Sequence, residues 1–349
     1  AIDALCAPTE WSSVEAAAAD ALLVSLHGFE PAPTVPLTAD MRAITGFRAV
    51  FRNLVATVET MRPGAAAHLD PEFLHEFRVA VRRIRTVSAA SRQVAPHGLV
   101  DRISDDAKWF GTLTGAARDL DVYQLEWSTY IDGLDATTVD QLEPLRELLA
   151  ERRQAAHTEV TDGLRGEQAA AILERWRHVV AVGDDDDGQL DGCPWADRPL
   201  HKVVVKRTAA AHDRLVSKGR KITASTPDKN VHRLRKDAKN LRYLVECFGG
   251  LYGGRERKRF VRTLKHFQDN LGEHQDAAVH AVELTELVAD NADRLPVETV
   301  LAAGRLIERL DQKRDAARLE FAERFAEFDS NATKRAFAKL LDSAKASSS

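Results

Sequence analysis

The sequences HEFRVAVRRIRTV at residues 75–87 and HRLRKDAKNLRYL at residues 232–244 match position for position at an offset of 157 residues, since 232 − 75 = 157. Both begin with a histidine, and basic residues follow it at the same places. The basic pairs are Arg78 with Arg235, Arg82 with Lys239, and Arg85 with Arg242. The same offset pairs Lys108 with Lys265, Phe110 with Phe267, Gly115 with Gly272, and Asp119 with Asp276. An offset that preserves charged and apolar positions together indicates an internal repeat.

Each of the two stretches has the period of an amphipathic α-helix. At about 100° per residue, Phe77, Val81 and Ile84 share one face, and the basic residues form a stripe beside it. The second copy repeats this apolar face with Leu234, Ala238 and Leu241. Cations three and four residues apart on a helix repel one another, so such a stripe needs an anionic ligand or acids from other helices. Because the stripe occurs twice, we interpret it as a ligand surface and expect the two stripes to form one continuous site. A solvated basic face with intramolecular salt bridges is the alternative.

The composition describes a globular protein with segregated charge. The 349 residues are 44% hydrophobic and 29% charged, and the net charge is −4. Residues 231–265 hold 11 Lys and Arg and 3 Asp and Glu, a local balance of +8, whereas residues 184–187 are four consecutive aspartates. This pattern excludes a generally basic protein that coats nucleic acid, and it focuses an electrostatic field at one place. Three cysteines without CxxC spacing argue against a disulfide scaffold, and no apolar run could span a membrane, so a cytoplasmic location is expected.

The periodicity predicts an all-α fold of two four-helix bundles, one for each repeat. In the first repeat, at about 40–183, a helix begins near Thr38 or Asp40 and ends before Pro63, and further helices cover 71–93, 100–131 and 139–182. Asp70 and Pro71 supply the cap and first position of the motif helix. The second repeat, at about 199–345, has predicted helices at 200–222, 227–248, 255–289, 297–328 and 331–343. The expected flanking segments are an appendage at 1–39 with a short helix at 13–26, an acidic linker at 184–198, and a disordered tail at 346–349.

Four motifs in this order resemble the CHAD domain, the conserved-histidine α-helical domain. They are HEFRVAVRRIR, KWFGTLTGAARDLDVY, VHRLRKDAKNLRYLVE and LKHFQDNLGEHQDAAV, and the resemblance covers about residues 40–345. It implies two four-helix bundles related by a pseudo-two-fold axis, with a central basic surface that binds inorganic polyphosphate. It also implies that the namesake histidines are His75 and His232. The basic residues of the two motif helices to which the resemblance assigns polyphosphate binding are Arg78, Arg82, Arg83, Arg85, Arg235, Lys236, Lys239 and Arg242.

The resemblance has two departures. Arg118 and Asp119 form an Arg-Asp pair in the first repeat, but the second repeat has Gln275 before Asp276. CHAD domains often follow a CYTH-type triphosphatase domain, and this sequence holds no ExExK string, so no catalysis is carried over and the chain is not expected to be an enzyme. A CYTH-type domain could lie upstream in a longer chain, and association with polyphosphate granules would follow from the ligand.

Further cations could extend the polyphosphate site. Lys108 and Lys265 could reach it from the next helix, and weaker candidates on the first helices are Arg48, Arg52, Lys202, Lys206 and Arg207. The two histidines could donate to phosphate when protonated, or they could serve as helix caps or bridges. Asp119 and Asp276 are expected to orient basic side chains or to cap a helix.

Three alternative functions remain. Glu72 and His75 fit the Glu-x-x-His pattern of di-metal bundles, but the second copy has Lys229 in place of the acid, so a metal-dependent phosphohydrolase is disfavoured and neither a metal nor another cofactor is expected. Nucleic-acid backbone binding would use the same stripes, although few aromatic residues lie among the charges to stack on bases. The third alternative is a scaffold that binds an acidic protein partner, and other polyanions are further candidate ligands of the basic stripes.

Overall fold

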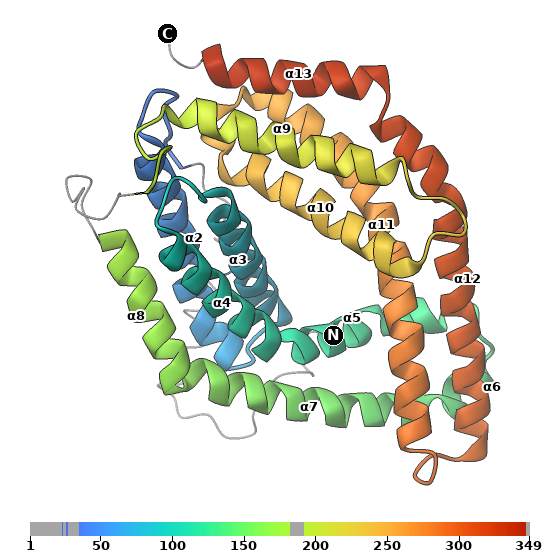
Figure 1. Cartoon of the computed structure of the whole chain (residues 1–349). Helices are drawn as coiled ribbons and strands as arrows, with labels where there is room; N and C mark the ends of the chain where they lie inside the picture. Colours follow the sequence, from blue (N-terminus) through green and yellow to red (C-terminus); the bar gives the residue numbers. More distant parts are fainter. Residues whose placement is uncertain (1–22, 24–25, 27–34, 182–191, 347–349) are drawn as a thin grey trace. The chain divides into compact units, whose positions relative to one another are not determined.

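The computed structural model describes residues 23, 26, 35–181 and 192–346, and within these residues it contains helices and no β-strand (Figure 1). The predicted all-α class is therefore confirmed. Most of the appendage at 1–39, with the short helix at 13–26, lies outside the described residues. The same holds for residues 184–191 of the acidic linker and for 347–349 of the tail, whereas Ala346 ends a helix. No helix of the described part combines the length and the apolar character that crossing a membrane requires.

The chain folds into two compact units whose boundaries do not follow the order of the sequence. Unit 1 holds residues 1–122 and 152–203, and unit 2 holds residues 123–151 and 204–349. Helices α5 (Gly115–Ile131) and α7 (Glu143–Arg165) each have residues in both units, and α6 (Ala136–Gln141) belongs to unit 2. Unit 2 therefore takes a stretch of 29 residues, 123–151, from the segment that the repeat assigns to the first half. The symmetry relation between the repeats stays a prediction.

Unit 1 is built from α2 (Ala43–Ala66), α3 (Pro71–Ala90), α4 (His97–Leu113) and α8 (Glu167–Ala181), which lie side by side in Figure 1. Its core is aromatic: Phe73, Phe77, Phe110 and Trp176 have no exposed surface. The Phe110 ring meets Phe77 edge to face at 5.3 Å and Trp176 at 5.6 Å, measured between ring centroids. These edge-to-face contacts fix how α3, α4 and α8 pack.

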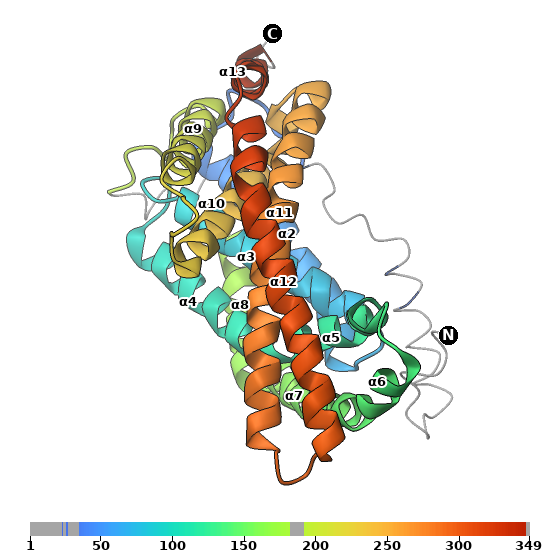
Figure 2. The ribbon, with the colours of Figure 1, turned by 90° about the vertical axis from the view of Figure 1, so that its right-hand side faces the viewer.

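Unit 2 is built from α9 (Leu200–Gly219), α10 (Asp228–Cys247), α11 (Gly254–Asp290), α12 (Val297–Phe328) and α13 (Asn331–Ala346), with a 3₁₀ turn at Gly249–Leu251. Figures 1 and 2 both show α11 and α12 running side by side as a long hairpin. Its core is also aromatic, because Phe267 stacks on Phe328 at 5.2 Å and His212 of α9 stacks on Phe337 of α13 at 3.9 Å. The motif helix α10 packs on α11.

The prediction is wrong at both ends of the first main helix, α2. Neither Thr38 nor Asp40 caps α2; its first backbone N–H groups, those of Ala43 and Ile44, instead donate to the carbonyls of Arg198 and Ala196. At the other end α2 continues through Pro63 to Ala66. The proline ring lacks an N–H donor and crowds the preceding turn, but the Pro63 carbonyl still accepts a hydrogen bond from Ala67 N–H.

Both long helices predicted in the first repeat are interrupted. The helix at 100–131 breaks at Thr114, which separates α4 from α5, and the helix at 139–182 breaks at Leu142 and Gly166, which leaves α6, α7 and α8. Thr114 is fully buried, and its hydroxyl donates to the Phe110 carbonyl at 2.7 Å. The interruption is a single residue, because the Thr114 backbone N–H still donates to the Phe110 carbonyl at 3.1 Å and the Thr114 carbonyl accepts from Arg118 N–H at 3.3 Å. In the second repeat the helix predicted at 297–328 matches α12 at both ends.

Candidate anion-binding site

The sequence at the start of α3 positions the first basic stripe. The Asp70 carboxylate accepts a hydrogen bond from the Glu72 backbone N–H at 2.7 Å, and Pro71 occupies the first helical position, both as predicted. Beyond this cap, Phe77 and Ile84 are fully buried. Since the apolar face is held by the core of unit 1, the basic residues beside it are directed to the edge of the packed surface.

Arg78, the first cation of that stripe, is committed to the fold. Its Nη1 donates to the Gly111 carbonyl at 3.1 Å and to the Thr114 hydroxyl at 2.7 Å, so it bridges α3 to the α4–α5 junction. Burial, together with repulsion from Arg82, lowers the pKa of Arg78 to about 10, while Asp119 acts in the opposite direction. Arg78 therefore remains charged at neutral pH, and one of its nitrogens, Nη1, is already engaged by the protein.

Arg235, the equivalent residue in unit 2, is engaged with an acid. Its Nη2 donates to the two carboxylate oxygens of Asp276 at 2.9 and 3.3 Å, and its side chain is only 19% exposed. The expectation that Asp276 orients an arginine is thus confirmed. A Cβ added at Gly115 would lie 4.0 Å from Arg78 Nη1, and one added at Gly272 would lie 3.9 Å from Arg235 Nη2. Each unit thus places an equivalent glycine beside an equivalent guanidinium.

The predicted binding residues differ in their exposure. Arg85, Lys108, Lys236 and Lys265 are exposed to solvent. His75, Arg82, Arg83, His232, Lys239 and Arg242 are half-buried, and Arg242 makes an ion pair with Glu246 at 3.6 Å and lies over the Tyr243 ring. Of the weaker candidates, Arg52, Lys202 and Lys206 are exposed and Arg48 and Arg207 are half-buried; Arg52 donates to the Val180 carbonyl. Among the main predicted binding residues, which lie on the motif helices and on the helices α4 and α11 packed against them, the four named first are therefore the cations most accessible to a dissolved ligand.

The hydrogen bonds between α3 and α4 show how Lys108 is placed. Arg78 contacts Gly111 and Thr114, whereas ten residues later the Ser88 hydroxyl donates to the Val100 carbonyl, so the two helices are antiparallel. In this register Lys108 of α4 lies at the level of Arg82 of α3. A cation of α4 therefore lies beside the basic stripe of α3.

Unit 2 also has a surface pocket of mixed charge where α5, α10, α11 and α12 meet. Its basic lining residues are Arg235, Lys239, Arg242 and Lys313, and its acidic ones are Glu126, Asp269, Glu273 and Asp276. The Tyr130 hydroxyl lies 2.8 Å from a Glu126 carboxylate oxygen and 2.7 Å from His280 Nδ1. Glu126, Tyr130, His280 and Lys313 were not predicted as site residues, because none of them lies within one of the four motifs.

The two namesake histidines lie in different surroundings. His75 shares one turn with Glu72 and Glu76, and a ligand atom from each lies within 4.8 Å of the others. Burial raises the pKa of Glu76, an effect opposed by Arg83 and Arg82. Burial and then repulsion from Lys236 lower the pKa of His232, whereas a hydrogen bond with Gln275 acts against them. His232 is therefore less readily protonated than a histidine in water.

The different partners of Arg78 and Arg235 predict different effects on stability. We expect Arg78→Ala to lower the free energy of unfolding by about 2 kcal/mol, because a buried hydroxyl and a carbonyl lose a charged donor. Arg235→Ala should cost less than about 1 kcal/mol, since its partner Asp276 is exposed and can be hydrated. Urea denaturation followed by circular dichroism compares the two variants, and equal losses would contradict this assignment.

The chain is all-α, and each of its two motif helices carries a histidine near its beginning and a basic stripe. These features define a class of helical proteins with an internal repeat and cationic motif helices. The model of the CHAD domain family matches residues 49–285, and the chain belongs to this family.

Two solved structures share its fold. The crystal structure of the CHAD domain from the plant Ricinus communis aligns with a TM-score of 0.64 and 24% identity, covering 88% of this chain and 96% of that one. PptA from Streptomyces chartreusis aligns with a TM-score of 0.63 and 15% identity, covering 81% of this chain and 99% of that one. No curated protein sequence gives a significant match.

Proposed function

We propose that this CHAD domain protein binds inorganic polyphosphate, without hydrolysing it, on the basic stripes of α3 and α10 and on the lysines that accompany them. The observation that carries the proposal is the set of exposed cations, Arg85, Lys108, Lys236 and Lys265. They come from both copies of the repeat, and each lies on a motif helix or on the helix packed against it. The half-buried cations Arg82 and Lys239 continue the same stripes.

The chemistry of these side chains suits a chain of phosphates. A guanidinium offers paired N–H donors to phosphate oxygens, and an ammonium offers a compact charge that tolerates many orientations. Arg82 adds a second observation, because its Nε is buried without a hydrogen-bond partner among the described residues. A phosphate oxygen beside the stripe would supply acceptors that the protein itself does not provide.

The aromatic residues near the stripes support a ligand without bases. Tyr243 of α10 is buried, and Trp109 of α4 packs edge to face against Phe110 at 5.1 Å. Tyr243 therefore offers no open ring face, and Trp109 is partly engaged in packing, whereas single-stranded nucleic acids stack on open aromatic rings. Nucleic-acid binding, the main alternative, would depend on the backbone alone.

Isothermal titration with polyphosphates of several chain lengths, followed by competition, tests the proposal. We expect binding at moderate salt, an affinity that rises with chain length, and no release of orthophosphate on long incubation. Single-stranded DNA or RNA at equal phosphate concentration should displace little of the polymer. Equal displacement by nucleic acid would replace polyphosphate with a general polyanion as the ligand, and absence of binding would favour an acidic protein partner.

The environment of His232 predicts a pH dependence. A bound phosphate oxygen favours the protonated imidazole, so the pKa of His232 should be higher in the complex than in the free protein, where burial lowers it. Affinity should therefore rise as the pH falls below about 6.5, by about tenfold for each unit by which the ligand raises that pKa. His232→Gln should flatten the dependence of the affinity on pH. The terminal phosphates of the polymer also titrate, but they do so equally for the wild type and the variant, so their effect cancels in the comparison. Parallel profiles would remove His232 from the site.

A further inference from the structure

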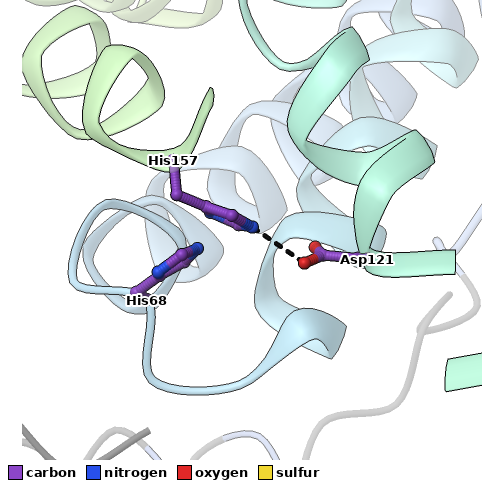
Figure 3. Close-up of side chains that lie close together, drawn as sticks. All are labelled: His68, Asp121 and His157. Atoms are coloured by element: carbon purple, nitrogen blue, oxygen red, sulfur yellow. Dashed lines mark hydrogen bonds and ion pairs between the residues drawn. The ribbon is translucent and has the colours of Figure 1, made fainter. Parts of the chain in front are cut away.

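Three side chains outside the basic stripes meet inside unit 1. His68 lies in the turn between α2 and α3, Asp121 on α5 and His157 on α7 (Figure 3). His157 Nε2 lies 2.8 Å from Asp121 Oδ1, and the two imidazole centroids are 3.0 Å apart at an angle of 56°. One ligand atom from each residue lies within 4.8 Å of the other two. Two imidazoles and a carboxylate at this spacing are a donor set that transition metals prefer.

The cluster is buried and its hydrogen bonding is incomplete. The side chain of Asp121 has no exposed surface, and that of His157 is 2% exposed. Three of their polar atoms, Asp121 Oδ2, His157 Nδ1 and His68 Nε2, are buried without a hydrogen-bond partner among the described residues. Leaving a buried polar group unsatisfied costs about 1–3 kcal/mol, so three such atoms at one place indicate that a ligand normally completes them.

The neighbouring residues orient the cluster without filling it. Arg153 Nε donates to Asp121 Oδ1 at 2.8 Å, which leaves Oδ2 of the same carboxylate unoccupied. His68 has a φ angle of 61°, a left-handed conformation that is uncommon outside glycine and that turns its ring toward His157 (Figure 3).

We propose that His68, Asp121 and His157 form a binding site for one divalent transition metal ion, with zinc as the best match. Neutral imidazole nitrogens and a carboxylate oxygen are standard zinc ligands, and three of them leave a fourth position for water. The Arg153 contact with Asp121 resembles the outer hydrogen bonds that hold metal-ligating carboxylates in place. The site is independent of the polyphosphate proposal.

The position of the site suggests a structural role. His68 lies two residues before Asp70, the residue that caps α3, while Asp121 and His157 lie on two other helices. A metal bound by all three would tie the α2–α3 turn to α5 and α7 and so hold the beginning of the motif helix. A ligand that binds only the native state raises its stability, so zinc should raise the melting temperature.

The second group of potential ligands in the described chain, Glu72, His75 and Glu76, is less suited to a metal. Arg82 and Arg83 already act on the buried Glu76 carboxylate, and Glu72 is exposed. Only one buried atom there, Glu76 Oε2, has no hydrogen-bond partner among the described residues, whereas the first cluster has three such atoms.

The test uses the full chain without an affinity tag, treated with chelator and then titrated with zinc by calorimetry. We expect one zinc ion per chain, a higher melting temperature, and nitrogen and oxygen ligands by X-ray absorption. His68→Gln and His157→Gln should each weaken zinc binding by more than about 100-fold, because losing even an outer-shell partner costs about 10–100-fold. His178→Gln is the matched control, since His178 is exposed on α8 of the same unit and should bind as wild type.

The outcomes separate clearly. Substoichiometric zinc in the wild type, sulfur ligands in the absorption spectrum, or unchanged affinity in both variants would overturn the proposal. If His157→Gln fails to fold because that residue is buried, His68→Gln decides alone, since His68 lies in a half-buried turn. A His68→Gln protein that folds and binds zinc like the wild type would contradict the site.

Discussion

Replacing Arg85, Lys108, Lys236 and Lys265 together by glutamine is expected to weaken polyphosphate binding about 100-fold. All four side chains are exposed, so their replacement should leave the fold intact. Each exposed contact with phosphate should contribute about 0.7 kcal/mol, and four of them give about 2.8 kcal/mol, which is about 100-fold in the dissociation constant. Isothermal titration at fixed salt measures the change, and circular dichroism checks that the helical signal persists.

The salt dependence of the same variant provides a second readout. Each phosphate contact releases counterions, with a logarithmic slope of about −0.9 per contact on a dense polyanion. Removal of four contacts should therefore reduce the slope by about 3 to 4. A matched control replaces Arg146, Arg165, Arg335 and Lys339 by glutamine; these exposed cations lie on α7 and α13, and we expect the affinity to change less than about threefold. Equal losses in the two variants would mean that binding follows net charge and not this site.

Trp176→Ala is expected to lower the free energy of unfolding by about 3–5 kcal/mol, the range for removing a large aromatic side chain from a core. Trp176 of α8 has no exposed surface and meets Phe51 of α2 and Phe110 of α4 edge to face at 6.0 and 5.6 Å. Its indole N–H also donates to an Asp106 carboxylate oxygen at 3.2 Å. The substitution thus leaves both a cavity and a buried carboxylate with fewer donors.

Two further variants separate these contributions. Trp176→Phe keeps much of the packing but loses the donor to Asp106, which also pairs with Arg175, so a loss of about 1–2 kcal/mol is expected. Trp109→Ala, at a half-buried position on α4, should cost less than Trp176→Ala. Urea denaturation gives all three values. A Trp176→Ala protein with wild-type stability would show that the aromatic core of unit 1 does not hold α2, α4 and α8 together.

Stabilisation at the helix ends shows where prediction from sequence succeeds. The Asp70–Pro71 start of α3 was predicted because the cap and the proline act within a few residues of one another. The start of α2 was not, because its first N–H groups donate to the carbonyls of residues about 150 positions later in the chain. The contact that Thr114 makes with Arg78 likewise joins residues of different helices.

The helical class, the spacing of the repeat and the residues of the two basic stripes could be predicted from the sequence, because they depend on spacing along a helix. The partners and the exposure of each cation, in contrast, are visible in the tertiary structure alone. Arg78 and Arg235 are satisfied by Thr114 and Asp276, whereas Lys108 and Lys265 are exposed. It alone also brought His68, Asp121 and His157 together. Burial and partnership depend on residues far apart in the chain, and no local spacing encodes them.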